Sequence, residues 1–186
     1  MQRSFALFPT AIGHCAVAWS DGEIAGSQLP EADEHATRRR MLRRFPGAAE
    51  ASPPQAVQRA IDGIIALLHG VHDDLTDVVL DMRDVPAFNR RVYEAARRIA
   101  PGTIVTYGDV ARQIGEPGAA QAVGQALGAN PFAPIVPCHR IVSADGKMHG
   151  FSAGGGTATK LRMLTIEGWR SGEPTLFDAG SPATAT

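Results

Sequence analysis

Cys138 lies between Pro137 and the pair His139–Arg140, an arrangement that can turn a thiol into a nucleophile. Only the thiolate attacks carbon, so the ordinary thiol pKa of about 8.5 has to be lowered by a neighbouring His, Arg or helix end. Adjacent side chains of an extended segment point to opposite faces, so a bridging water or a local turn has to connect His139 with the sulfur. A buried structural cysteine is the more common explanation of an isolated Cys-His pair, and only the surrounding sequence can set it aside.

The surrounding sequence contains a series of ordered motifs. They are Gly102-Thr-Ile-Val-Thr-Tyr107-Gly-Asp-Val-Ala111, Ala122-Val123-Gly124, Asn130-Pro131, Pro-Cys-His-Arg at 137–140, Gly150-Phe-Ser152, Gly155-Gly156, Lys160 and Glu167-Gly168. In order and spacing they resemble the O6-alkylguanine-DNA alkyltransferase family, also called methylated-DNA–protein-cysteine methyltransferases. The resemblance covers residues 86–168, and residues 1–85 fall where the family carries a variable N-terminal domain.

The resemblance implies transfer of an alkyl group from O6 of guanine to Cys138, with O4-alkylthymine as a second candidate substrate. The sulfur displaces the base in line and forms a thioether that nothing in the site can hydrolyse, so each molecule reacts once. His139 would be the general base, acting through water and oriented by the carboxylate of Glu167, as in a catalytic triad. Without the family spacing, Glu167 would be interpreted as an exposed residue at a helix end.

Two further residues complete the implied catalytic set. Tyr107 matches a tyrosine that helps to rotate the target phosphate and contacts the flipped base, and its alternative is a core aromatic residue. Asn130 matches a structural asparagine whose side chain bonds the backbone beside the cysteine.

The resemblance also assigns substrate contacts around the sulfur. Phe151 would wall the pocket, Ser152 would place a hydroxyl near O6, and the backbone at Ile141 would recognise the guanine edge. Arg140 is grouped with these substrate- and DNA-binding residues, although we favour a role in holding the site together by pairing with a carboxylate or carbonyl.

The implied partner is alkylated double-stranded DNA, bound from the minor groove with the target guanine flipped into the pocket. Ala122 and Gly124 are small enough for close approach to the groove. The family has an arginine before Ala122 that fills the vacated place in the base stack, and in this chain that residue is Gln121. Residues 118–130 contain no Lys or Arg, so phosphate contacts from this segment are missing and DNA binding should be weaker.

Three alternatives stay open. One is a damage-binding protein related to the alkyltransferases, although such proteins carry another residue at the position of Cys138. The second is an alkyltransferase with weak base flipping because of Gln121. The third is a helix-turn-helix regulator with an incidental cysteine, which the Pro-Cys-His-Arg context disfavours.

Neither a metal nor a cofactor is expected. The candidate ligands show no standard zinc spacing; they are His14, Cys15, His35, His69 and His72. Because the reaction needs a free thiol, we expect a reducing compartment and therefore a cytoplasmic protein. We also expect a monomer.

The first half of the chain predicts a small α/β layer. Segments 13–20 and 24–29 flank Asp21-Gly22, a strong hairpin signal. Residues 32–45 predict a basic amphipathic helix whose arginines we interpret as a solvated face rather than a nucleic-acid contact. Pro53-Pro54 opens a second helix, and residues 76–80 predict a short strand.

The second half predicts helices. Pro86 starts one that ends at Pro101-Gly102, residues 107–114 and 118–129 form a pair around a Gly-containing turn, and residues 157–167 form the last. Such a pair is typical of a helix-turn-helix. The fold class is therefore α+β, with an RNase H-like N-terminal α/β domain over residues 1–85. A mostly helical, winged-helix-like domain follows over residues 86–170, and the tail 171–186 is expected to be disordered.

Composition agrees with a globular protein that binds an anionic partner. The hydrophobic content is 44%, and no apolar run has the length of roughly 20 residues that a membrane helix needs. Residues 1–85 hold 8 Lys/Arg against 12 Asp/Glu, whereas residues 86–170 hold 10 against 5. A basic half suits a phosphate-binding surface, and a solvated surface explains so modest an excess equally well.

Overall fold

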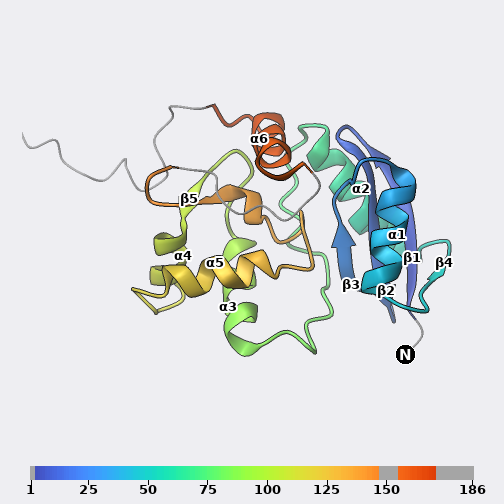
Figure 1. The fold of residues 1–186 in the computed structure, drawn as a ribbon, viewed down its shortest axis with the longest axis horizontal. Helices are drawn as coiled ribbons and strands as arrows, with labels where there is room; N and C mark the ends of the chain where they lie inside the picture. The colour runs from blue at the N-terminus through green and yellow to red at the C-terminus, as the bar shows by residue number, and fades with distance from the viewer. Residues whose placement is uncertain (1–2, 147–154, 171–186) are drawn as a thin grey trace, which may run out of the picture.

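The computed structural model describes residues 3–146 and 155–170, which form two parts lying side by side (Figure 1). One part is a sheet with helices α1 (Glu34–Arg44) and α2 (Gln55–Leu68), and the other holds helices α3 to α6 with two short strands. The mixed α+β architecture predicted from the sequence is confirmed. The tail 171–186 lies outside the described residues. None of the helices in the described ranges has the length and apolar character needed to cross a membrane.

The sheet has the strand order β3-β2-β1-β4. Strands β1 (Ser4–Thr10), β2 (Gly13–Ser20) and β3 (Glu23–Gln28) are antiparallel, and β4 (Ala49–Glu50) runs parallel to β1. Asp21 and Gly22 connect β2 to β3 with φ angles of 52° and 82°, the left-handed geometry that a two-residue hairpin turn requires. The predicted hairpin is confirmed, and β1 and β4 are additional strands.

Strand β2 is buried on both faces of the sheet. Val17 and Trp19 belong to the core cluster on the α2 side, whereas Ala16 and Ala18 belong to the cluster that contains Met41 of α1. Because successive strand side chains point to opposite faces, one helix has to cover each face. Both predicted helices are present in these places.

Residues 76–80 do not form the predicted strand. They contribute only an isolated bridge between Ile24 and Leu80. Arg97 explains the difference, because its Nη2 donates to the carbonyl oxygens of Leu75, Thr76 and Val78 at 2.7, 3.0 and 2.8 Å. A guanidinium thus satisfies backbone groups that a strand partner would otherwise have to bond.

The helical part contains α3 (Ala87–Ala96), α4 (Tyr107–Gln113), α5 (Ala120–Gly128) and α6 (Gly156–Ile166). The last three lie within one or two residues of the predicted ranges, the usual uncertainty of helix ends. Helix α3 ends earlier than predicted, and Ile99 is buried beyond it.

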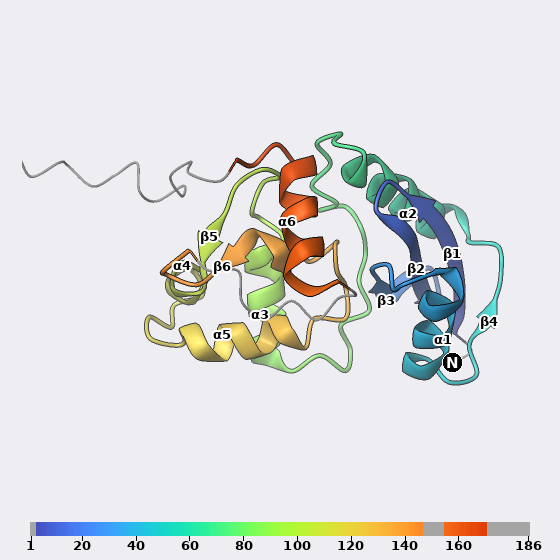
Figure 2. The ribbon, with the colours of Figure 1, turned by 45° about the horizontal axis from the view of Figure 1, so that its top comes forward.

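Helices α4 and α5 are placed by specific polar contacts. Thr106 and Asp109 form a reciprocal capping box that fixes the start of α4. The buried hydroxyl of Tyr93 on α3 donates to the carbonyl of Ala126 on α5 at 2.9 Å. Figure 2 shows this helix pair at the end of the molecule away from the sheet, with β5 (Val105–Thr106) and β6 (Ile141–Val142) paired in parallel beside it.

The inner face of α6 carries two charged residues. Lys160, Met163 and Leu164 are buried on this helix, and Glu167 directly after it is buried as well. These positions follow the i, i+3, i+4, i+7 spacing of one helix face. Helix α6 therefore brings charged groups into the interior, where they need partners.

The boundary between residues 85 and 86 stays a prediction. The largest apolar cluster contains Val17 and Ile64 from the first part together with Tyr93 and Val123 from the second. A shared cluster of this kind means that the two parts pack on each other rather than stand apart.

Candidate active site

Cys138 opens a 3₁₀ turn, Cys138–Arg140, that leads into β6. The Cys138 N–H donates to the carbonyl of Val136 at 2.9 Å, and the Arg140 N–H donates to the carbonyl of Pro137 at 3.0 Å. The chain thus turns at this point, one of the two features that the sequence analysis named as able to connect His139 with the sulfur. The thiol is half-buried, whereas His139 is fully buried behind it.

The loop before the cysteine, residues 130–137, is the active-site loop, and Asn130 holds it in shape. Its Nδ2 donates to the carbonyl of Val136 at 2.9 Å, and its Oδ1 accepts the N–H of Phe132 at 2.9 Å. One side chain thus links the start and the end of the loop that leads to Cys138. These are the backbone contacts that the sequence predicts for Asn130, and its importance for the reaction stays a prediction.

The sheet also holds this loop, from the side of β3 and α1. The Ser27 N–H donates to the carbonyl of Pro131 at 2.8 Å, and the Ser27 Oγ donates to the carbonyl of Ala133 at 2.7 Å. Arg44 Nη2 donates to the same Pro131 carbonyl at 3.0 Å. The first part of the chain therefore fixes the shape of the active-site loop, and no local sequence pattern indicates this role for Ser27 or Arg44.

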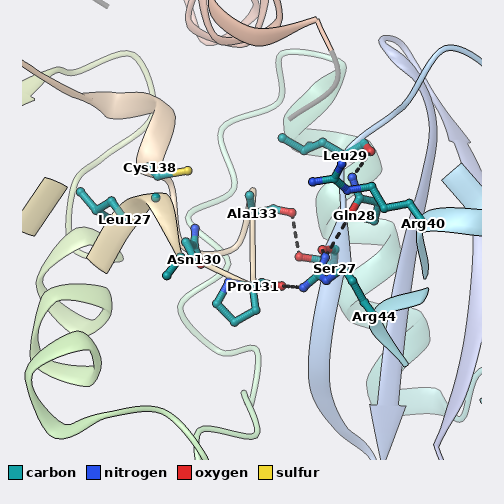
Figure 3. Close-up of a pocket in the computed structure, with 12 residues that line it drawn as sticks. Ser27, Gln28, Leu29, Arg40, Arg44, Leu127, Asn130, Pro131, Ala133 and Cys138 are labelled. Atoms are coloured by element: carbon teal, nitrogen blue, oxygen red, sulfur yellow. Dashed lines mark hydrogen bonds between the residues drawn. The ribbon is translucent and has the colours of Figure 1, made fainter. Parts of the chain in front are cut away.

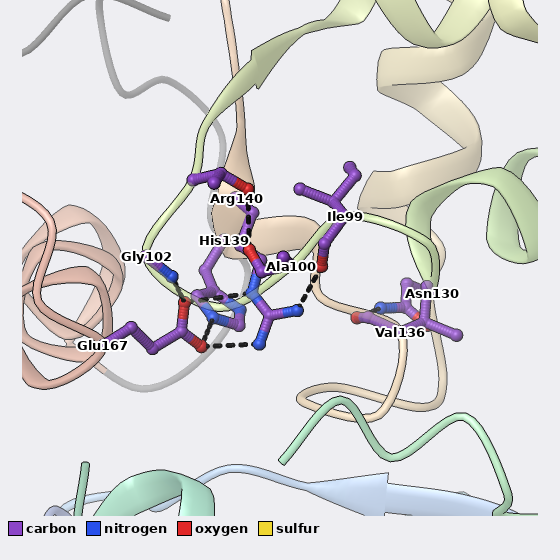
Figure 4. Close-up of polar contacts among 9 residues, drawn as sticks. Ile99, Ala100, Gly102, Asn130, Val136, His139, Arg140 and Glu167 are labelled. Atoms are coloured by element: carbon purple, nitrogen blue, oxygen red, sulfur yellow. Dashed lines mark hydrogen bonds and ion pairs between the residues drawn. The ribbon is translucent and has the colours of Figure 1, made fainter. Parts of the chain in front are cut away.

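Behind the thiol, a buried network joins His139, Arg140 and Glu167 (Figure 4). Glu167 Oε1 lies 2.8 Å from His139 Nε2 and accepts from Arg140 Nη2 at 2.8 Å. Glu167 Oε2 accepts from Arg140 Nε at 2.9 Å, and Arg140 Nη1 donates to the carbonyl of Ile99 at 2.6 Å. Arg140 is 1% exposed. It therefore holds the site together, the role we favour for it, and reaches no substrate in this arrangement.

Gly102 completes the environment of Glu167. Its N–H donates to Glu167 Oε2 at 3.2 Å, so four donors meet the two carboxylate oxygens. Gly102 has a φ of +78°, and a Cβ at this position would lie 2.6 Å from the carbonyl oxygen of Glu167. Any other residue would have to displace the backbone of Glu167 and adopt a strained left-handed conformation, so glycine is required here.

The network fixes the protonation of His139. Burial raises the pKa of Glu167, but the hydrogen bonds from His139 and Arg140 and the charge of Arg140 outweigh it and hold this pKa well below its ordinary value. An ionised carboxylate only accepts hydrogen bonds, so His139 Nε2 has to be the donor. Burial lowers the pKa of His139 below its ordinary value, which keeps the ring neutral with its lone pair on Nδ1. Nδ1 has no hydrogen-bond partner among the described residues and is free to accept a proton.

In the resting protein the pKa of the Cys138 thiol is raised rather than lowered. Burial raises the pKa of Cys138, while the Asn130 side chain and the charge of Lys160 oppose this. Lys160 is 1% exposed, its Nζ donates to the carbonyl of Ile141 at 2.6 Å, and burial lowers its pKa. The resting thiol is thus protonated, so a base has to act in the reaction.

Lys160 had no assigned role in the sequence prediction. A signal existed, because helical spacing puts Lys160 on the same face as Met163, Leu164 and Glu167. A lysine on the buried face of a helix needs a compensating partner, and such residues cluster at functional sites.

The sulfur faces a cavity of about 280 Å³ between the sheet and the helical part (Figure 3). Figure 3 shows the Cys138 Sγ pointing toward the side from which Arg40 and Arg44 of α1 approach. The lining residues come from β3 and the loop after it, α1, the end of α5 and the active-site loop; they are Ser27, Gln28, Leu29, Arg40, Arg44, Leu127, Gly128, Ala129, Asn130, Pro131, Ala133 and Cys138.

Tyr107 lies near this centre, at the first position of α4. Burial and the negative charge of a Cys138 thiolate both raise its pKa, so its hydroxyl stays protonated. A Cβ at Gly124 on α5 would lie 4.0 Å from the Tyr107 ring, which places the small residue of this helix against the tyrosine.

The remaining predicted contacts are spread along the chain. On α5, Gln121 is exposed and Ala122 is half-buried, one to two turns before the residues that line the cavity. Ile141 is fully buried in β6 directly after the turn. Phe151 and Ser152 lie outside the described residues. No group of three or more potential metal ligands occurs within residues 3–146 and 155–170.

Comparison with known proteins identifies close similarities. Residues 87–169 match the family model described as 6-O-methylguanine DNA methyltransferase, DNA binding domain. The methylated-DNA–protein-cysteine methyltransferase of Mycobacterium tuberculosis (strain H37Rv) is 44% identical over 126 residues, which cover 67% of this chain and 74% of that protein. The crystal structure of the M. tuberculosis O6-methylguanine methyltransferase superposes with a TM-score of 0.71 and 33% identity, covering 89% of this chain and 93% of that one. A structure of the M. tuberculosis protein in complex with DNA gives a TM-score of 0.71 with 33% identity, over 88% of this chain and 92% of that one.

Proposed function

Because this chain belongs to the methylated-DNA–protein-cysteine methyltransferase family, we propose that it repairs DNA by taking the alkyl group of O6-alkylguanine onto Cys138. The observation that carries the proposal is a half-buried thiol facing a cavity, backed by a buried His139–Glu167 pair whose Nδ1 is free. O4-alkylthymine is proposed as a second substrate. The reaction consumes one protein molecule for each lesion.

Deprotonation of the thiol is the first step of the proposed reaction. His139 is neutral and accepts the thiol proton on Nδ1 through one water, and Glu167 stabilises the imidazolium that forms. Because the resting pKa of Cys138 is raised, the thiol stays protonated until this base acts, which limits its reaction with other electrophiles.

Transfer is an in-line displacement at the alkyl carbon. The sulfur–carbon bond forms as the carbon–O6 bond breaks, and its electron pair stays on the guanine. The guanine anion then takes up one proton, which balances the proton lost from the thiol. The protonated Tyr107 hydroxyl is proposed to donate to the base during this step. The product is a thioether without a leaving group that water could displace at this site.

DNA is proposed to bind through α4 and α5 from the minor groove, with the target nucleotide flipped into the pocket at a cost of a few kcal/mol. The structure of the related M. tuberculosis protein in complex with DNA supports this proposal. Ala122 and Gly124 would allow close approach, and Gln121 would stand at the vacated place in the stack. Phe151 and Ser152 are proposed to enclose the base.

The proposal also covers the two domains of the chain, its cellular compartment and its oligomeric state. The strand order and the α4–α5 pair support an RNase H-like first part and a winged-helix-like second part, divided near residue 85. The free thiols of Cys15 and Cys138 support a reducing, cytoplasmic compartment. The large exposed apolar side chains among the described residues lie on separate elements, which supports a monomer; they are Leu42, Val71, Val79 and Leu161.

The direct test is intact-mass and peptide mapping after incubation with a duplex that contains O6-methylguanine. We expect one added methyl group per molecule, on the peptide that carries Cys138, and none in a Cys138→Ser variant. Cys15 is an internal control, because burial raises its pKa to about 12 and it should stay unmodified. Repair by Cys138→Ser, or repair of more than one lesion per molecule, would contradict the proposal.

A second candidate function is an alkyltransferase with weak base flipping, favoured by the exposed Gln121 and the uncharged segment 118–130. A damage-binding relative that lacks chemistry is disfavoured by Cys138 itself. For Gln121→Arg we expect faster transfer from an alkylated duplex and an unchanged rate with O6-benzylguanine as the free base. Equal changes with both substrates would show that residue 121 does not serve base flipping.

A further inference from the structure

The cavity in front of Cys138 has a positively charged wall that the alkyl transfer itself does not need. Arg40 and Arg44 of α1 line it opposite the sulfur (Figure 3). Transfer of a methyl group uses a nucleophile, a base and hydrogen bonds to guanine, all of which the helical part and the active-site loop provide. Arg44 also holds the active-site loop, so the guanidinium of Arg40 in particular requires a separate explanation.

Arg44 is not neutralised by any carboxylate in the described part of the chain. Its Nη1 donates to the carbonyl of Ser27 at 2.6 Å and to Gln28 Oε1 at 3.1 Å, and its Nη2 donates to the carbonyl of Pro131. All three acceptors are neutral. Burial and the nearby charge of Arg40 lower the pKa of Arg44, as expected for a cation without a counter-ion.

Arg40 is only partly neutralised. Its Nε lies 3.2 Å from Glu31 Oε1, and the Arg40 side chain is 39% exposed. Glu31 also accepts from Gln28 Nε2 at 3.1 Å. The Arg40 Nη groups have no hydrogen-bond acceptor within residues 3–146 and 155–170, and Figure 3 shows the guanidinium directed toward the cavity. One carboxylate thus faces two guanidinium groups, which leaves a net positive charge on this wall.

The geometry of the displacement directs part of the substrate toward this wall. Sulfur, the reacting carbon and O6 have to lie in line, so any substituent on that carbon projects sideways, beside the sulfur. For a methyl group the substituent is hydrogen and reaches nothing. For a longer alkyl group it occupies the cavity that Cys138 shares with Arg40, and the small side chain of Ala133 leaves room there.

We propose that this cavity is a subsite for alkyl groups that end in a carboxylate, with Arg40 as the residue that recognises the anion. The simplest such substrate is O6-carboxymethylguanine in duplex DNA. The inference rests on the proposed function and names a preferred substrate class for the same site. In the reaction the Cys138 sulfur bonds the methylene carbon and the carbon–O6 bond breaks with its pair left on guanine. The thiol proton balances the proton that guanine takes up.

Arg40 is the residue to vary, because Arg44 also holds the active-site loop through Pro131. The matched control is Arg39→Gln, which removes the same charge from the same helix at an exposed position outside the cavity. The three duplexes carry O6-methylguanine, O6-carboxymethylguanine and O6-carbamoylmethylguanine. The carbamoylmethyl group is a neutral amide with the shape of the carboxymethyl group, so the comparison isolates charge.

For the wild type, single-turnover transfer should be about tenfold faster from the carboxymethyl than from the carbamoylmethyl duplex, the value of one charge-assisted contact. Arg40→Gln should remove that preference and leave methyl transfer unchanged, and Arg39→Gln should behave like the wild type. Arg40→Lys should keep part of the preference. Higher salt should reduce the preference of the wild type, because the charge is partly exposed.

Other outcomes overturn the inference. A wild type without preference for the carboxymethyl over the carbamoylmethyl duplex excludes an anion subsite. Equal slowing of all three substrates in Arg40→Gln, with a normal unfolding temperature, assigns Arg40 to a DNA phosphate instead. If the wild type transferred no methyl group from O6-methylguanine, the proposed function itself would be refuted. This result differs from a missing carboxymethyl preference and from equal slowing of all three substrates.

Discussion

Replacing Glu167 by Gln should destabilise the protein far more than loss of one surface charge. The carboxylate has four donors around its two oxygens, from His139 Nε2, from Nε and Nη2 of Arg140, and from the Gly102 N–H. Glutamine offers one oxygen and one NH2 group, so its NH2 has to face donors whichever way the amide is turned. Arg140, 1% exposed, would in addition lose its counter-ion.

Two lines of reasoning give the size of the effect. The pKa of Glu167 is lowered from 4.5 to about 2, which corresponds to about 3 kcal/mol of stability at neutral pH. Removing one partner of a buried ion pair costs roughly 3–5 kcal/mol. We therefore expect a loss of about 3 kcal/mol in the free energy of unfolding of Glu167→Gln, and a melting temperature lower by about 6–12 °C.

The pH dependence gives an independent check with a fixed sign. A carboxyl whose pKa is depressed in the folded state stabilises the protein above its unfolded pKa, and this stabilisation is lost as pH falls through the folded pKa. The difference between wild type and Glu167→Gln should therefore be complete at neutral pH and shrink as pH falls from 4.5 toward about 2. Guanidinium unfolding followed by circular dichroism at several pH values measures it.

The matched control is Glu116→Gln. Glu116 pairs with Arg91 at the surface, where the two side chains are 43% and 48% exposed. Such a pair contributes less than about 1 kcal/mol. If Glu167→Gln lost no more stability than Glu116→Gln, or if its loss did not change with pH, the buried network would not have the energetic role assigned to it.

The other predictions concern the chemistry. Lys160→Met removes the charge that lowers the pKa of Cys138, so iodoacetamide labelling of Cys138 should shift to higher pH and transfer from O6-benzylguanine at neutral pH should slow by about tenfold. An unchanged labelling profile would exclude this role. Because burial lowers the pKa of His139, the transfer rate should fall to half of its plateau value only at a pH below 6.5. A rate already halved at or above pH 6.5 would show that His139 is not held neutral.

The family motifs located the residues at the centre of the site from sequence alone. Cys138, His139 and Glu167 were recognised together because their order and spacing match one family, and the structure places them in contact or in adjacent positions. Local patterns also predicted the hairpin at Asp21-Gly22 and helices α4 and α5 within one or two residues. These signals depend on neighbours within a few residues along the chain.

Other predictions differ from the structure, because the outcome depends on residues that lie far away in the sequence. Residues 76–80 were predicted to form a strand, but Arg97 takes carbonyl groups that a strand would pair. The sequence led us to expect a lowered thiol pKa, but burial raises the pKa of the resting Cys138 against the opposing effects of Asn130 and Lys160. Burial and charge around an atom depend on segments that the local sequence does not contain.

The amino-acid sequence by itself predicted the reacting atom, since Cys138 next to His139 in this motif indicates a nucleophile and its base. Only the tertiary structure decided what surrounds that atom. Ser27 meets Ala133 across 106 residues and Arg44 meets Pro131 across 87, contacts that close the active-site loop and bring cationic groups opposite the sulfur. Turn and helix preferences act over one or two turns of chain, whereas the packing of the sheet against the helical part sets the shape and charge of the cavity.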